Sequence, residues 1–158
     1  MSYSKRLGDC TVYFKDPQCR IIHRLDGPAA VYDNGSVEWY RNGKPHREDG
    51  PAIENTSTSA SLIVREWYYN GENHREDGLA VEYADGMLSW YRHGFYHRLD
   101  GPAVMRNSSL GETAHYYVNG NLCELDEFPK AVANWVSVIE VTTEDVKRAI
   151  GDYRIVEW

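Results

Sequence analysis

The chain has 158 residues, is 42% hydrophobic and carries a formal net charge of −7. This charge argues against nucleic acid as the partner, because phosphate-binding proteins normally present a basic face. No apolar run is long enough to span a membrane, and residues 1–7 contain no apolar stretch of the signal-peptide type. Three cysteines without metal-ligand spacing indicate free thiols. We therefore expect a cytoplasmic protein without a metal or other cofactor.

The first 22 residues are expected to form an N-terminal cap, since 10–15 and 19–22 resemble a degenerate pair of opening strands. Residues 23–122 then carry a recurring heptapeptide, His-Arg-x-Asp-Gly-Pro-Ala, with leucine in place of proline once. It begins at His23, His46, His74 and His97, every 23–28 residues. Such a period is typical of an array in which one small unit stacks on itself.

Local signals within the unit favour strands and tight turns. Residues 36–41 alternate in polarity, as a half-buried strand does. Asn42-Gly43 then predicts a two-residue hairpin turn, because both positions tolerate positive φ. In the following turn, Gly50 is expected to adopt a left-handed conformation. The fold predicted for 23–122 is mainly β: an antiparallel meander or solenoid of about four units of 23–28 residues.

The pattern decays after the fourth heptapeptide. Tyr116 stands where tryptophan is expected and Cys123 where histidine is expected. The segment 123–158 is predicted to be a small α+β cap over the last open edge. Its elements would be a helix over 125–134 with Asp126 as N-cap and Pro129 in the first turn, a strand over 135–141, a helix over 144–150 and a strand over 153–158.

Recurrence favours a structural role for the heptapeptide over a catalytic one, because an active site is usually made once. Arginine and aspartate can pair in one turn or between adjacent turns, and histidine can pack on a neighbouring ring and bond the backbone. Stacked histidines would stand about 10 Å apart, too far for one zinc ion. The residues assigned to building the unit are His23, Arg24, Asp26, Gly27, Trp39, His46, Arg47, Asp49, Gly50, Trp67, His74, Arg75, Asp77, Gly78, Trp90, His97, Arg98, Asp100 and Gly101.

The unit Trp-Tyr-x-Asn-Gly-x-x-His-Arg-x-Asp-Gly-Pro-Ala resembles the MORN repeats, over roughly residues 20–122. The ordinary MORN unit is shorter and lacks the heptapeptide. The extended form is similar to that of uncharacterised phage, giant-virus and microbial proteins. The resemblance implies a binding or scaffolding surface. We therefore predict a non-catalytic protein-binding module, such as a phage or viral accessory protein that binds a host protein.

Two sets of aromatic residues are candidates for contact with a partner. Consecutive residues of a strand face opposite sides, so we expect tryptophan to be core and tyrosine to form an outward ladder. The third unit also replaces Asn-Gly-Lys-Pro with an exposed His-Gly-Phe-Tyr turn. The candidate binding residues are Tyr40, Tyr68, Tyr91, Tyr117, His93, Phe95 and Tyr96.

Two other functions are compatible with the sequence. A carbohydrate-binding module would stack sugars on the tyrosine ladder. A small enzyme would place its site near Cys123 and His115, although no nucleophile motif, phosphate loop or metal signature supports it. Open strand edges would also allow a homodimer.

Overall fold

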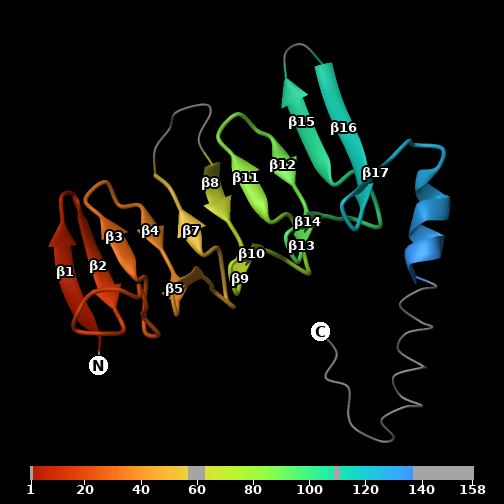
Figure 1. Cartoon of the computed structure of the whole chain (residues 1–158). Coiled ribbons are helices and arrows are strands. Elements are labelled where there is room, and N and C mark those ends of the chain that lie inside the picture. The colour runs from red at the N-terminus through yellow and green to blue at the C-terminus, as the bar shows by residue number, and fades with distance from the viewer. Residues whose placement is uncertain (1, 57–62, 109–110, 137–158) are drawn as a thin grey trace, which may run out of the picture.

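The computed structural model describes residues 2–56, 63–108 and 111–136, which form a mainly β protein. Figure 1 shows the strands in a row, with the N-terminus at one end and a helix at the other. Neighbouring strands of the main sheet are antiparallel and follow one another in chain order, so the predicted β-meander is confirmed. No closed barrel is formed by the described strands.

The main sheet has eleven strands, and at three places the chain leaves it to form a hairpin and then returns. Its members, in spatial order, are β1 (Tyr3–Leu7), β2 (Cys10–Phe14), β3 (Ala30–Tyr32), β4 (Val37–Glu38), β7 (Ile53–Glu54), β8 (Ile63–Glu66), β11 (Val81–Tyr83), β12 (Leu88–Ser89), β15 (Val104–Ser108), β16 (Gly111–Val118) and β17 (Asn121–Cys123). β1 pairs only with β2, so its outer edge is open within the part of the chain described.

Three two-stranded hairpins form a second row beside the main sheet (Figure 1). They are β5 (Tyr40–Arg41) with β6 (Lys44–Pro45), β9 (Tyr68–Tyr69) with β10 (Glu72–Asn73), and β13 (Tyr91–Arg92) with β14 (Phe95–Tyr96). Asn42 and Gly43 have φ values of 53° and 79°, as the predicted two-residue turn requires. The corresponding residues of the next two hairpins are also at positive φ.

The glycine of the heptapeptide has a different role from the one expected. Gly50 is not among the residues with positive φ, so the prediction of a left-handed conformation is wrong. A Cβ atom at this position would stand 2.9 Å from Cζ of Arg47. The guanidinium group folds closely over the backbone there, so a larger residue would displace it.

The alanine that closes each heptapeptide anchors the unit in the main sheet. Ala29, Ala52, Ala80 and Ala103 are completely buried. The N–H of Ala52 donates to the carbonyl of Glu66 at 2.7 Å, and its own carbonyl accepts from Trp39 at 2.7 Å. A methyl group is therefore enclosed between strands that come from adjacent units.

One helix, over residues 128–136, follows β17. It begins later than predicted, with N–H groups of Phe128 and Ala131 donating to Glu124 and Glu127, although Pro129 is in the first turn as expected. Residues 135–136 are helical, so the predicted strand is wrong there. The rest of that strand, the helix over 144–150 and the strand over 153–158 lie outside the described residues. No described helix is long and apolar enough to cross a membrane.

Candidate binding grooves

The arginine of each heptapeptide forms a clamp, because it packs on a preceding aromatic ring and bonds within its own turn. Cζ of Arg47 lies 3.8 Å from the ring centroid of Trp39, while its Nε donates to Asp49 at 2.8 Å and its Nη1 to the Pro51 carbonyl at 3.1 Å. Arg75 and Arg98 repeat this arrangement over Trp67 and Trp90. These arginines lower the pKa of Asp49, Asp77 and Asp100 through hydrogen bonds.

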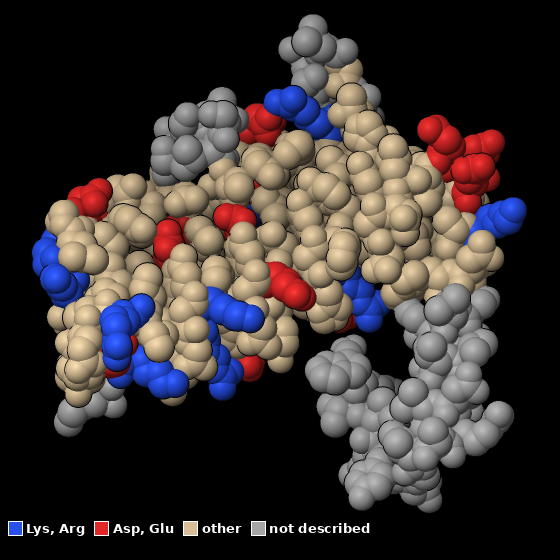
Figure 2. Space-filling model, viewed as in Figure 1, with Lys and Arg blue, Asp and Glu red and all other residues tan. Residues whose placement is uncertain are grey.

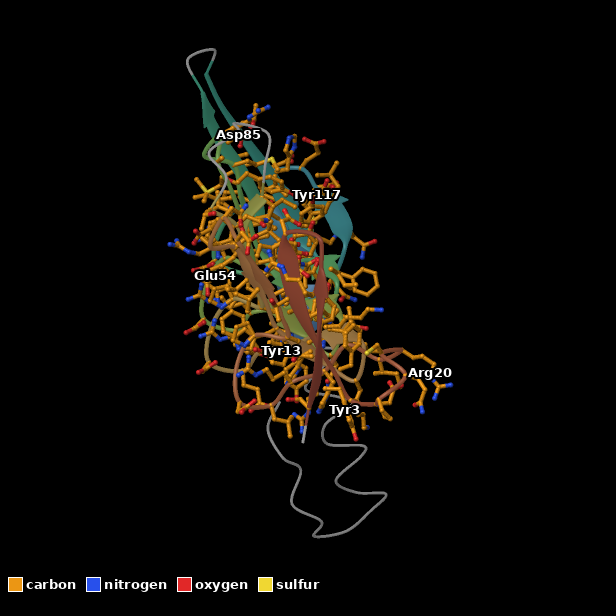
Figure 3. All side chains as sticks on the ribbon, turned by 90° about the vertical axis from the view of Figure 1, so that its left-hand side faces the viewer. Tyr3, Tyr13, Arg20, Glu54, Asp85 and Tyr117 are labelled. Atoms are coloured by element: carbon orange, nitrogen blue, oxygen red, sulfur yellow. The ribbon has the colours of Figure 1, made fainter. Side chains whose placement is uncertain are left out.

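Tyr13 takes the place of tryptophan in the clamp of the first heptapeptide. Arg24 lies 4.0 Å above its ring and donates to Asp26 at 3.0 Å. In Figure 3, which shows the molecule from its N-terminal end, Tyr13 lies within the stack of side chains, whereas Arg20 extends away from it. Sequence reasoning missed this residue because it stands ten positions before the histidine instead of seven.

The histidine of each heptapeptide holds the turn of the next hairpin. Nδ1 of His46 accepts from the N–H of Asn70 at 3.1 Å. The same bond joins His23 to Asn42 at 2.9 Å, His74 to His93 at 3.2 Å and His97 to Asn119 at 2.9 Å. Because Nδ1 is the acceptor, the proton of the neutral ring is on Nε2.

The environment of Nε2 depends on the residue two positions after the histidine. In the second and third heptapeptides this residue is glutamate, and Nε2 of His46 and His74 lies 3.3 Å from Glu48 and Glu76. The first and fourth heptapeptides have Leu25 and Leu99 instead.

Two grooves separate successive heptapeptides, and the clamps and histidines line both of them. Groove 1, of about 860 Å³, lies between the second and third heptapeptides, and its lining includes 47–51, Trp67, Tyr69, 74–77 and His93. Groove 2, of about 490 Å³, lies between the third and fourth, and its lining includes 75–78, 90–92 and 97–100.

Groove 1 contains a row of aromatic and imidazole rings. Tyr69 lies 5.0 Å from His46 and 6.1 Å from His74, whose ring is 4.3 Å from that of His93 (centroid distances). Tyr69 is 39% exposed and occupies the position held by arginine in the flanking units. Sequence reasoning included His93 but missed Tyr69, although its departure from the arginine of its neighbours was a signal.

Acidic groups outnumber basic ones in groove 1. Arg47 and Arg75 are engaged by Asp49 and Asp77, which leaves two glutamate carboxylates beside the ring row. Over the face in Figure 2, acidic and basic side chains are interspersed, with a group of acidic side chains near the start of the C-terminal helix. Carboxylates next to exposed rings suit a cationic group.

The tyrosines expected to face solvent are half-buried. Burial raises the pKa of Tyr40 and Tyr68 to about 12, and the Tyr68 hydroxyl donates to Glu66 at 2.8 Å. Tyr91 and Tyr117 lie on either side of Tyr96, at 4.4 and 5.0 Å between centroids. The tryptophans are also half-buried, so the expected division into a tryptophan core and an outward tyrosine ladder is wrong.

The side chains of the turn predicted to be exposed in the third unit contact different parts of the molecule. His93 is exposed and belongs to groove 1, whereas Phe95, 56% exposed, lies against the next hairpin at Gly120. Tyr96 is half-buried within the tyrosine stack. The structure therefore does not bring these three side chains together as one surface.

The pair suggested for an enzyme is separated by the strand register. Cys123 pairs with Tyr116, and His115 is the adjacent residue of β16. Adjacent strand residues face opposite sides, so Cys123 and His115 lie on opposite faces. Within the described residues no group of three or more histidine, cysteine or acidic side chains is placed to hold a metal ion.

No family model matches the chain, and neither the curated proteins nor the solved structures include a match.

Proposed function

We propose that this chain is a non-catalytic protein-binding module and that groove 1 is its main contact surface. The observation that carries the proposal is the ring row of Tyr69, His74 and His93 in a groove of about 860 Å³ between two clamped turns. Exposed rings in a concave site are the usual anchors of a protein contact. The resemblance to extended MORN repeats, including those of phage and giant-virus proteins, supports binding over catalysis.

The chemistry of groove 1 suits a basic segment of a partner protein. An arginine or lysine side chain would pack on the Tyr69 ring and pair with the carboxylates of Glu48 and Glu76. The side chains of these glutamates are 67% and 54% exposed. The clamps hold the walls in place before the partner arrives, which reduces the ordering cost of association. The net charge of −7 favours the approach of a basic partner.

The test is selection from a random peptide library followed by calorimetry on the selected peptides. We expect enrichment of arginine and lysine and binding that weakens as salt is added. Tyr69→Arg should weaken binding about tenfold or more, because it places a cation where the ligand's cation lies. This variant uses the residue that the flanking units carry, so its fold is preserved, and Tyr69→Phe is the matched control that keeps the ring.

Selection of peptides without basic residues, or equal affinity in wild type and Tyr69→Arg, would contradict the proposal. The carbohydrate alternative would stack sugars on the tyrosine row, whose rings are half-buried. A glycan array probed with the same variants distinguishes the two, because sugar binding would not depend on salt.

A further inference from the structure

His97 has a buried hydrogen-bond donor that nothing in the described chain satisfies. Its Nδ1 accepts from Asn119 at 2.9 Å, so the neutral ring carries its proton on Nε2. The residue is 9% exposed, and Nε2 is enclosed without a partner among the residues that the structure describes. Buried donors are nearly always paired, so this exception requires an explanation.

Comparison with the other heptapeptides shows which group is missing. In the second and third, the same nitrogen faces a glutamate carboxylate at 3.3 Å. In the fourth, the glutamate is replaced by Leu99, which has no acceptor. The scaffold around His97 is thus built to present an N–H to a carboxylate that this heptapeptide does not supply.

A cation without an ion-pair partner among the described residues lies in the same groove. Arg98 and Arg75 are engaged by Asp100 and Asp77. Glu76, the other carboxylate of the lining, lies 3.3 Å from Nε2 of His74. Arg92 has no carboxylate within ion-pair distance among the described residues, and its Cζ lies 5.2 Å from the ring centroid of Trp135. The Trp135 ring is in turn 4.5 Å from that of His97, so Arg92 and His97 flank one indole.

We propose that groove 2 binds a carboxylate of a partner polypeptide, which accepts from Nε2 of His97 and pairs with Arg92. This carboxylate would take the place of the glutamate present in the second and third heptapeptides. It would enter beside the half-buried Leu99 side chain, which lines the groove. The carboxylate would belong either to a glutamate or aspartate side chain or to a chain terminus, and the inference does not depend on what groove 1 binds.

Burial and the nearby Arg92 charge lower the pKa of His97. The ring therefore remains neutral at physiological pH and keeps the tautomer in which Nε2 donates. A charge-assisted hydrogen bond to a carboxylate is stronger than one between neutral groups. Within groove 2 the ligand thus gains one directional bond from His97 and one charge partner from Arg92.

The test uses the full chain and nuclear magnetic resonance of its histidine rings. Three probes are titrated: N-acetyl-glutamate amide for a side-chain carboxylate, N-acetyl-alanine for a terminal carboxylate, and N-acetyl-glutamine amide as the uncharged match. We expect a saturable shift of the His97 ring signals at millimolar concentrations of at least one carboxylate probe. The glutamine probe should bind about tenfold more weakly or not at all.

Leu99→Glu supplies the missing carboxylate from within and should abolish this shift. Leu25→Glu makes the same change in the first heptapeptide, outside groove 2, and should leave the shift unchanged. Tyr69→Arg should also leave it unchanged, which separates failure of this inference from failure at groove 1. Equal binding of the glutamine probe, no saturable shift with either carboxylate, or an unchanged shift in Leu99→Glu would overturn the proposal.

Discussion

Groove 1 and groove 2 are adjacent and share the third heptapeptide, including Glu76, yet they differ at the position two residues after the heptapeptide histidine. Both are lined by clamp arginines and by the tryptophan on which one of them packs. In groove 1 the position after His46 and Arg47 is Glu48, so a carboxylate satisfies the histidine and faces the groove. In groove 2 that position is Leu99, and an N–H is left without an acceptor among the described residues. One variable position on a constant scaffold thus sets what each groove offers.

The largest effect is expected from a change that damages the shared wall. Ala80→Leu would add three carbon atoms at a completely buried position of the third heptapeptide. Overpacking of this kind should lower the free energy of unfolding by about 1–3 kcal/mol and weaken both grooves. Urea denaturation measures it. Leu79→Pro, which restores the residue of the other heptapeptides, is the control and should be near neutral; equal stability of the two variants would contradict the role of Ala80.

A double replacement, Glu48→Leu with Glu76→Leu, should make groove 1 resemble groove 2. It removes the two exposed glutamate carboxylates beside Tyr69, so binding of basic peptides should weaken about tenfold, or by about 1.4 kcal/mol. Calorimetry against a selected basic peptide measures this. Glu82→Leu removes a carboxylate outside both grooves and should have little effect, whereas an equal loss there would indicate only a general charge effect.

The reverse replacement, Leu99→Glu, should stabilise the chain. It provides an acceptor for the buried Nε2–H of His97, and such a bond contributes about 0.5–1.5 kcal/mol. Comparison of urea midpoints for this variant and Leu25→Glu isolates the effect from that of the added charge. Equal changes of the urea midpoint in both variants would mean that the unpaired Nε2–H of His97 does not affect stability.

The smallest effect concerns pH. Burial lowers the pKa of His74 and His97 from the ordinary value of 6.5, so the unfolded chain binds more protons than the folded one near that pH. The contribution of these histidines to stability should therefore be fully present above pH 6.5 and decline as the pH falls below it toward the folded-state pKa values.

Leu99→Glu should raise the pKa of His97, because the new carboxylate favours the charged ring, and ring titration by nuclear magnetic resonance measures it. A pKa unchanged by this variant would mean that the added carboxylate lies away from Nε2.

Several features of the fold follow from local sequence. Asn42-Gly43 specifies its turn because both residues tolerate positive φ, whatever surrounds them. Alternation and recurrence predicted the meander because both patterns can be seen within a few consecutive units of the sequence. The sequence was compatible with arginine–aspartate pairs within one turn or between adjacent turns. The structure shows the first arrangement, in which Arg47 pairs with Asp49 two residues away.

Contacts between units could not be predicted from local sequence, because the residues that meet are far apart in the chain. Sequence alone did not show that Gly50 makes room for the Arg47 guanidinium, that Tyr13 completes the first clamp, or that Tyr69 is open to the groove. Nor did it show that the helix continues through residue 135, where Trp135 packs on His97.

The Asn-Gly turns, the antiparallel order of the strands and the recurring residues of the heptapeptide thus follow from local sequence, since backbone preference and close spacing act within a single unit. The folded chain was needed to show which rings are covered, which nitrogen lacks a partner among the described residues and which groove is acidic. These properties depend on how one unit stacks on the next, and residues such as His97 and Asn119, or Tyr69 and His46, meet only after that stacking.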